Sequence, residues 1–226
     1  MLLLVAGVAV ASAAAGVLGE RWWRARASPL LPPDIGAIRR RIDVRVAAHE
    51  AGHAALAWTS PFTVRVAEVT IAARGEAGGL TIYHASCDPH AATGPRGIGA
   101  LWYTTAINLG GIAGELLTHD KVRSGHSAPD LREARAHAER IVALGGAAAC
   151  PWPATDEPRL DVAAMFVDRP PQEVERVLSA SYARARSVLL RDRARFDALV
   201  ALLLARETVV EREMEQALGP RQRLRV

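Results

Sequence analysis

The pattern of hydrophobic and polar residues opens with an unbroken apolar run. Residues 1–19 contain no charged side chain, and a stretch of about 20 apolar residues is long enough to span a bilayer. No Lys or Arg precedes this run, whereas Arg21, Arg24 and Arg26 follow it directly. Because cytoplasmic flanks carry the positive charge, the pattern predicts a single-pass anchor in the cell membrane, with the rest of the chain in the cytoplasm. A cleaved signal peptide is the alternative, since residues 11–13 (Ala-Ser-Ala) resemble a cleavage site.

The next apolar segment predicts a buried helix. Val46–Leu56 is rich in alanine, so the sides of this helix are small enough to be buried against other elements. Asp43 precedes the segment and is the expected N-cap. Gly52 lies inside the helix, where it costs about 1 kcal/mol relative to alanine. We therefore expect another element to pack closely against Gly52.

Two short β-branched runs follow this helix. Residues 63–72 and 80–83 flank a loop that contains several glycines, which predicts a small antiparallel strand pair. Such a pair has a free edge, and an extended peptide can add to that edge as a further strand. The pair can equally well serve only to cover one side of the core.

A second long apolar run, Ile98–Thr118, is close to the length of a membrane span. It contains Asn108, Glu115 and four glycines, so we interpret it as a buried core helix. After a polar loop over residues 119–127, the pattern predicts a helix from Ser127 or Ala128 to about Leu144. The expected fold is therefore mainly α with a small β-sheet (α+β), preceded by one N-terminal transmembrane helix.

Composition and charge narrow the function classes. The chain has 226 residues, of which 50% are hydrophobic, and this is enough for one good core. The formal net charge of +4 comes from arginines scattered among acids rather than from a basic stripe, so nucleic-acid binding is not expected. Cys87 and Cys150 are the only cysteines, and two cysteines make neither a disulfide framework nor a zinc ribbon.

The candidate chemistry lies in the sequence His49-Glu50-Ala51-Gly52-His53. Two histidines four residues apart share one helix face, about 6 Å apart along the axis, so both imidazoles can reach one metal ion. Glu50 projects beside such a metal, where it can accept a proton from an activated water. The pentapeptide also occurs by chance on helices that bind nothing, but buried histidines without a metal would be costly. His84 and His90, in a later loop, are expected to be surface histidines.

A catalytic zinc site of this kind needs a third protein ligand. Asp130 stands in the expected first turn of its helix, where its carboxylate can be aimed at the metal. An acid in a first turn can instead serve only the helix dipole. Glu115 and Glu133 are the other two carboxylates that can take this place.

Several motifs occur in a fixed order along the chain. They are His49-Glu50-Ala51-Gly52-His53-Ala54, Glu68-Val69-Thr70-Ile71 with Arg74-Gly75 and Gly79, Gly110-Gly111-Ile112-Ala113-Gly114-Glu115, Gly125 to Asp130-Leu131, and segments between Glu173 and Met214. Together they resemble the peptidase domain of the FtsH family of membrane-bound AAA proteases. The resemblance covers residues 37–218, and we expect an anchor at 1–19, an Arg- and Pro-rich linker at 20–36 and a basic tail at 219–226.

The resemblance implies roles for individual residues. His49, His53 and Asp130 correspond to the family's zinc ligands, and Glu50 corresponds to its catalytic base. The segment before the aspartate is one residue longer than the family pattern and places Pro129 directly before Asp130. By resemblance, the chain is expected to be a zinc-dependent metalloendopeptidase that cleaves unfolded or membrane-associated polypeptides.

The ATPase module of that family is not expected in this chain. A nucleotide-binding G-x-x-x-x-G-K-[ST] loop does not occur in the sequence, whose only lysine is Lys121. We therefore expect no ATPase activity of its own, and as partners a second copy of the chain or an ATPase acting in trans. The alternative function is a non-proteolytic scaffold that binds a full-length FtsH-type protease. The intact Glu50 argues against it, because a scaffold is free to lose its base.

Overall fold

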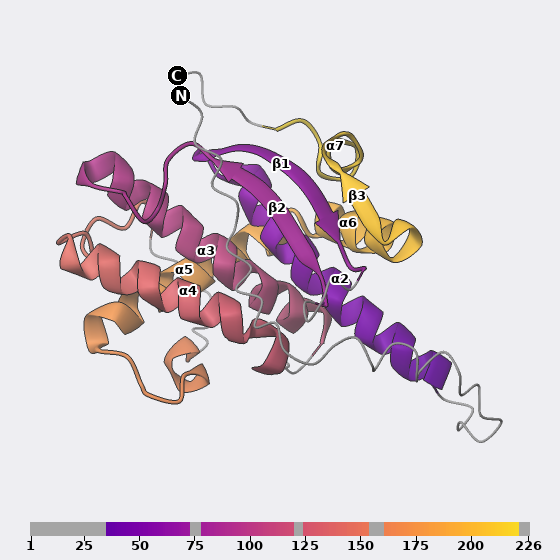
Figure 1. Cartoon of the computed structure of the whole chain (residues 1–226), viewed down its shortest axis with the longest axis horizontal. Coiled ribbons are helices and arrows are strands. Elements are labelled where there is room, and N and C mark those ends of the chain that lie inside the picture. Colours follow the sequence, from indigo (N-terminus) through magenta and orange to yellow (C-terminus); the bar gives the residue numbers. More distant parts are fainter. Residues whose placement is uncertain (1–34, 73–77, 120–123, 154–160, 222–226) are drawn as a thin grey trace, which may run out of the picture.

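The computed structural model describes residues 35–72, 78–119, 124–153 and 161–221 of the chain. Most of these residues are helical, and a small antiparallel sheet accompanies the helices (Figure 1). The elements are α2 (Ile35–Thr59), β1 (Thr63–Thr70), β2 (Leu80–Ala85), α3 (Gly94–Thr118), α4 (Ser124–Ala143), the 3-10 helix η1 (Val162–Met165), α5 (Gln172–Arg191), α6 (Arg193–Arg206), β3 (Thr208–Val210) and α7 (Glu211–Leu218). The predicted α+β fold class is confirmed for this part of the chain.

The sheet has three strands in the order β2-β1-β3, and both pairings are antiparallel. The predicted pair is confirmed, with Val66 opposite Tyr83. The third strand was not predicted, because β3 has only three residues and its pairing with β1, Val69 opposite Val209, joins segments far apart in the chain. Among the described residues no strand pairs with the outer edge of β2.

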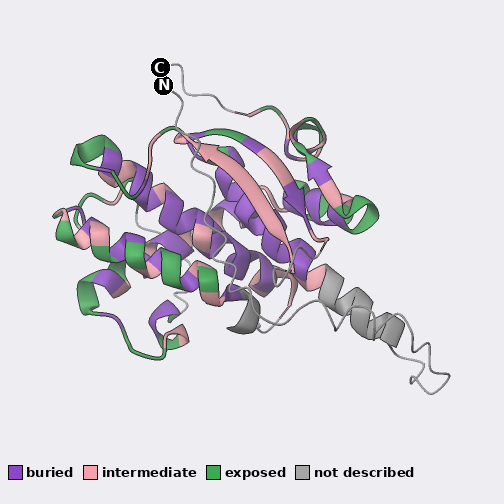
Figure 2. Ribbon diagram, in the orientation of Figure 1, coloured by how far each residue is buried: buried purple, intermediate pink, exposed green. Residues whose placement is uncertain are grey.

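The C-terminal half of helix α2 lies at the centre of the molecule, between the sheet and the helical layer (Figure 1). It contacts β1 and β2 on one side and α3, α5 and α6 on others. Its alanines from Ala47 to Ala57 are buried, as are Val66 and Val69 of β1, and Figure 2 shows buried residues concentrated along α2 and α3. The prediction of a small-sided, buried helix is confirmed.

Helices α2 and α3 cross in direct backbone contact. A β-carbon placed on Gly52 would overlap the carbonyl group of Gly110, and one placed on Gly114 would overlap the carbonyl oxygen of Ala48. Only hydrogen atoms fit at these positions. The expectation that another element packs closely on Gly52 is confirmed, and that element is the second long apolar run.

Several predicted boundaries were wrong. Helix α2 begins at Ile35, so Asp43 lies within the helix and is not its N-cap. The three arginines at positions 39–41 are good helix formers and extend the helix toward Ile35. Helix α4 begins at Ser124, inside the segment predicted as a polar loop. His84 lies in β2, opposite Arg65, rather than in the loop that follows.

The predicted membrane segment falls on residues 1–19, which lie outside the described residues. So do most of the predicted linker and most of the basic tail; residues 35–36 of the linker form the first residues of α2. In the described ranges no helix is both long enough and apolar enough to cross a bilayer. This agrees with the interpretation of the run around Asn108 as a core helix.

The helix crossing predicts the effect of Gly52→Ala. Alanine is the better helix former by about 1 kcal/mol, yet its methyl group must push α3 away, so we expect a net loss of about 2 kcal/mol in the free energy of unfolding. Gly99→Ala is the control, since its methyl group would meet only the ring of Phe62. Urea denaturation of both variants measures the difference. Wild-type stability for Gly52→Ala would contradict the close crossing.

Candidate metal centre

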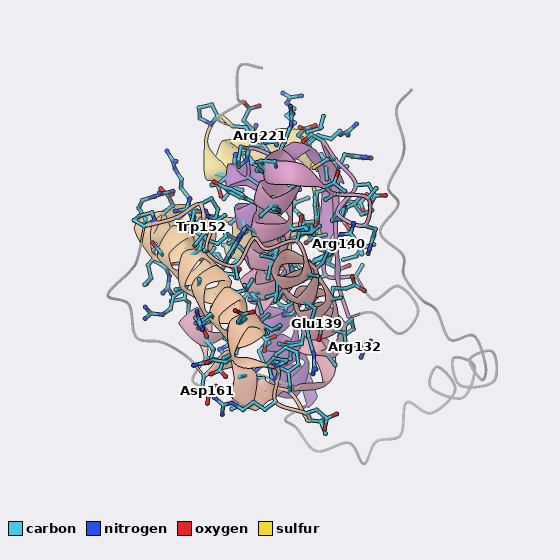
Figure 3. The ribbon with its side chains drawn as sticks, turned by 90° about the vertical axis from the view of Figure 1, so that its left-hand side faces the viewer. Arg132, Glu139, Arg140, Trp152, Asp161 and Arg221 are labelled. Carbon is cyan, nitrogen blue, oxygen red and sulfur yellow. The ribbon has the colours of Figure 1, made fainter. Side chains whose placement is uncertain are left out.

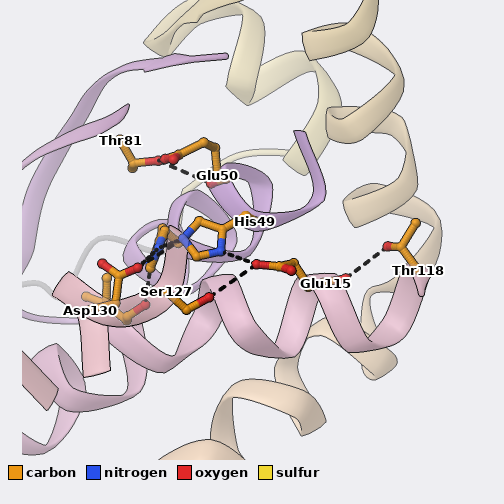
Figure 4. A network of polar contacts seen from close by, with 10 residues as sticks. His49, Glu50, Thr81, Glu115, Thr118, Ser127 and Asp130 are labelled. Carbon is orange, nitrogen blue, oxygen red and sulfur yellow. Dashed lines mark hydrogen bonds and ion pairs between the residues drawn. The ribbon is translucent and has the colours of Figure 1, made fainter. Parts of the chain in front are cut away.

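Three ligand-type side chains meet at the centre of the molecule (Figure 4). His49 and His53 lie one turn apart on α2, both buried, and their Nε2 atoms are 3.0 Å apart. Oδ2 of Asp130, from α4, lies 3.0 Å from Nε2 of His49 and 3.5 Å from Nε2 of His53. Asp130 keeps about a quarter of its side chain exposed, so the group is reached from solvent on the α4 side.

Helix α3 fixes the orientation of both imidazoles from behind. Nδ1 of His49 donates to Oε1 of Glu115 at 2.8 Å, and Nδ1 of His53 donates to the carbonyl oxygen of Ile107 at 2.7 Å. A carboxylate and a carbonyl can only accept, so the proton of each neutral ring resides on Nδ1. In the neutral rings the Nε2 lone pairs would then face the other two ligand atoms, where a metal ion can bind them.

Glu115 is a buried carboxylate with a positioning role. Its side chain is only 2% exposed, and Oε1 accepts from Ser127 Oγ at 3.3 Å as well as from His49. Carboxylates behind metal-binding histidines hold the ring and raise its basicity. Glu115 thus lies behind His49, on the far side from Asp130, and does not join the group of three.

The donor set fits a divalent transition metal. In a tetrahedral site with bonds of about 2.0–2.2 Å, ligand atoms lie roughly 3.3 Å apart. The three separations of 3.0, 3.0 and 3.5 Å match that spacing. Two neutral imidazoles and one carboxylate suit zinc and similar ions better than calcium or magnesium, which prefer oxygen alone.

In the metal-free protein, His49, His53 and Asp130 create a site that favours positive charge. Burial by itself lowers the pKa of His49, but hydrogen bonds to Asp130 and Glu115 outweigh burial and raise it to about 10. His53 is buried too, and the charge of Asp130 raises its pKa in the same way. The histidines in turn hold the pKa of Asp130 well below its usual range, against the effect of burial. Without a metal, the cluster holds protons in its place.

Glu50 lies beside this group, on the same helix but directed toward the sheet (Figure 4). The Thr81 hydroxyl, on β2, lies 2.8 Å from Oε2 of Glu50 and 3.2 Å from its backbone carbonyl. No hydrogen bond ties Glu50 to either histidine in the described structure. Burial raises the pKa of this carboxyl, while the nearby His53 and His49 oppose that rise. Glu50 is therefore a buried carboxylate with a higher proton affinity than a surface glutamate.

Gly111 explains why the ligand atoms have room. A β-carbon on this α3 residue would lie 2.6 Å from Nε2 of both His49 and His53. Such a carbon would overlap the Nε2 atoms of both rings. The two neighbouring glycines of α3 therefore have different roles. Gly110 allows the backbone of α2 to pack closely, and Gly111 leaves space for the Nε2 atoms of His49 and His53.

Comparison with known proteins agrees with this geometry. The sequence profile of peptidase family M41 matches residues 37–217. The chain belongs to peptidase family M41. That match spans both helices of the α2–α3 crossing, the sheet and α4, so every side chain of the metal centre lies within the family region.

Individual M41 relatives are longer than this chain. It is 31% identical over 194 residues to ATP-dependent zinc metalloprotease FtsH 4 of Sphaerobacter thermophilus, covering 77% of this chain and 28% of that protein. It is 32% identical over 184 residues to FtsH 3 of the same organism, covering 78% and 35%. FtsH 2 of Symbiobacterium thermophilum is 34% identical over 174 residues, covering 73% and 28%. The chain therefore spans about a third of the length of these relatives.

The structure brings together the three residues expected as ligands, His49, His53 and Asp130. Asp130 lies further into its helix than expected, because α4 begins at Ser124 rather than at Ser127 or Ala128. The other two carboxylates are placed elsewhere, Glu115 behind His49 and Glu133 in a separate group. Sequence reasoning missed Thr81 and Gly111, whose contacts arise only when β2 and α3 pack on α2.

Three conservative substitutions separate these carboxylates. Asp130→Asn should weaken zinc binding most, by about 100-fold or more, because it removes the charge of a proposed ligand. Glu115→Gln should weaken it by roughly 10-fold through His49 alone. Glu133→Gln should leave this site at wild-type affinity, and Glu139→Gln, on the exposed face of α4, is the control for the assay. Competition with a chelating dye measures all three, and an unchanged affinity in Asp130→Asn would exclude Asp130 as a ligand.

The raised pKa of His49 predicts a pH dependence with a definite sign. Since that pKa is about 10 in the metal-free chain, a metal that binds Nε2 must displace a proton at neutral pH. Zinc affinity should then fall as pH falls, by about tenfold per unit for each proton displaced. Titrations at about pH 8 and pH 7, corrected for the chelator, measure this slope. An affinity independent of pH would contradict the protonated, metal-free cluster.

Proposed function

We propose that this chain is a zinc-dependent metalloendopeptidase that hydrolyses peptide bonds of unfolded polypeptides. The observation that carries the proposal is the arrangement of His49, His53 and Asp130 around one point, with the buried carboxylate of Glu50 beside them. The named M41 relatives are zinc metalloproteases, which supports the same assignment. A non-proteolytic scaffold does not need a general base such as Glu50 beside a metal site, so this function is the weaker alternative.

The proposed ligands are Nε2 of His49, Nε2 of His53 and a carboxylate oxygen of Asp130. When bound, zinc supplies Lewis-acid chemistry, lowering the pKa of a coordinated water toward about 7 and polarising the scissile carbonyl. The protein's part is to hold the ligand atoms in place. The acceptors on α3 fix the neutral tautomer of both rings, and both histidines are buried.

Glu50 is the proposed general base. Thr81 occupies Oε2 as a hydrogen-bond donor, which leaves Oε1 available to accept a proton from the attacking water. Burial raises the pKa of the Glu50 carboxyl, so it holds the accepted proton better than a surface glutamate would. The same carboxyl then donates this proton to the amine that leaves. Thr81 keeps the carboxylate oriented through both transfers.

The sheet supplies a place for the substrate. Strand β2 carries Thr81, which touches Glu50, and its outer edge pairs with no strand among the described residues. An extended peptide that adds to this edge would run past the base and the ligands. Only an unfolded segment can pair in this way. Folded substrates would then need an unfolding partner, such as an ATPase acting in trans, and the anchor over residues 1–19 stays a prediction that fits membrane-associated substrates.

The sharpest test is Glu50→Gln. Glutamine keeps the size of the side chain and its contact with Thr81 but cannot accept the proton, so hydrolysis should fall by about 100-fold or more while zinc content stays unchanged. Glu139→Gln, on the exposed face of α4, is the matched control with full activity. Cleavage of casein without nucleotide, with and without a chelator, measures the effect.

Two outcomes would count against the proposal. Wild-type hydrolysis by Glu50→Gln would remove Glu50 from the base role. A zinc-loaded wild-type chain that cleaves no unfolded polypeptide would favour the scaffold alternative.

A further inference from the structure

A second group of ligand-type side chains lies outside the metal centre. It consists of His90, in the segment between β2 and α3, with Glu133 and His137 of α4. Each residue offers one ligand atom, and these atoms all lie within 4.8 Å of one another. Glu133 and His137 are four residues apart, so they project from one face of α4. The rings of His90 and His137 lie 5.8 Å apart between centroids.

His137 is the unusual member of this group. Its side chain is buried, with 4% of the residue exposed, yet its Nε2 atom has no hydrogen-bond partner. A buried nitrogen without a partner costs about 1–3 kcal/mol. On the other side of the ring, Nδ1 lies 3.4 Å from the amide nitrogen of Asn108 on α3. When the Asn108 amide is turned over, its oxygen can accept a hydrogen bond from the Nδ1–H, which leaves the Nε2 lone pair for a metal.

The protonation state of His137 agrees with a ligand role. Burial, together with the charges of His90 and Arg140, lowers its pKa to about 4. The ring is therefore neutral at pH 7, and neutral imidazole is the form that binds metals. Arg140 lies one turn further along α4 (Figure 3). Its guanidinium donates to the carbonyl oxygen of Ala92 at 3.1 Å and so already joins α4 to the segment that carries His90.

We propose that His90, Glu133 and His137 form a second site for a zinc-type divalent ion, separate from the peptidase centre. Two imidazoles and one carboxylate are a zinc donor set, and a water can complete the tetrahedron. The ligand atoms must close from within 4.8 Å to roughly 3.3 Å. His90 and Glu133 are exposed and can do so by rotation about their side-chain bonds, while His137 stays fixed.

This second ion would have a structural effect rather than a catalytic one. His137 lies seven residues beyond Asp130 on α4, about 10 Å along the helix axis, whereas paired catalytic metals lie about 3.5–4 Å apart. The bound ion would tie the segment after β2 to α4. Because β2 carries the edge proposed for substrate, the ion would hold one end of that edge in place. The site depends on none of the residues of the peptidase centre, so each proposal can fail alone.

Titration of zinc chloride into the metal-free full chain tests the proposal by calorimetry. Wild type should bind two equivalents, and His90→Ala should bind one. Glu133→Gln should weaken only the second equivalent, by at least about tenfold. Both residues are exposed, so neither substitution is expected to disturb folding. His84→Ala removes a histidine outside both groups and is the control that keeps two equivalents.

The outcomes separate the two sites. Asp130→Asn should lose the peptidase equivalent and retain the one that His90→Ala removes. A single equivalent in wild type that His90→Ala leaves unchanged would overturn the second site and leave the peptidase proposal intact. Two equivalents in both wild type and His90→Ala would also overturn it, because the second ion would then lie elsewhere.

Discussion

The whole arrangement depends on how closely α2 and α3 approach. At Gly52 and Gly110 the two backbones touch, and a single methyl group on either side would separate them. At that distance the carbonyl of Ile107 and the carboxylate of Glu115 reach the Nδ1 atoms of the two histidines. A wider crossing would break the hydrogen bonds from both imidazoles to α3, and the loss of two buried hydrogen bonds costs more than the low helix propensity of glycine.

The same crossing decides what the site can do. Because α3 holds both rings from behind, their Nε2 atoms point to one place, and Asp130 completes the set from α4. Glu50 is one residue away from His49 but is turned to the sheet, where Thr81 holds it. The two histidines and the proposed base thus come from one short segment of α2 yet have different partners. This separation is what allows the proposed base to change its protonation without disturbing the ligands.

Sequence reasoning predicted the parts of this site that are local in the chain. The spacing of His49 and His53, the alanine-rich sides of their helix and the close contact at Gly52 follow from helix geometry and residue size. The contacts of Thr81 and Gly111 could not be predicted, because they arise only when β2 and α3 pack on α2. The sequence predicts His90 to be a surface histidine, and its exposure confirms this. Its proximity to His137 arises only when the segment after β2 packs on α4.

The central claim is that His49, His53 and Asp130 hold one zinc ion. X-ray absorption at the zinc edge, on the full chain carrying His90→Ala and loaded with one equivalent, tests it most directly. We expect a first shell of nitrogen and oxygen at about 2.0–2.2 Å, with the outer scattering of two imidazole rings and no sulfur. Sulfur at about 2.3 Å, which would have to come from Cys87 or Cys150, or a shell without imidazole scattering, would contradict it.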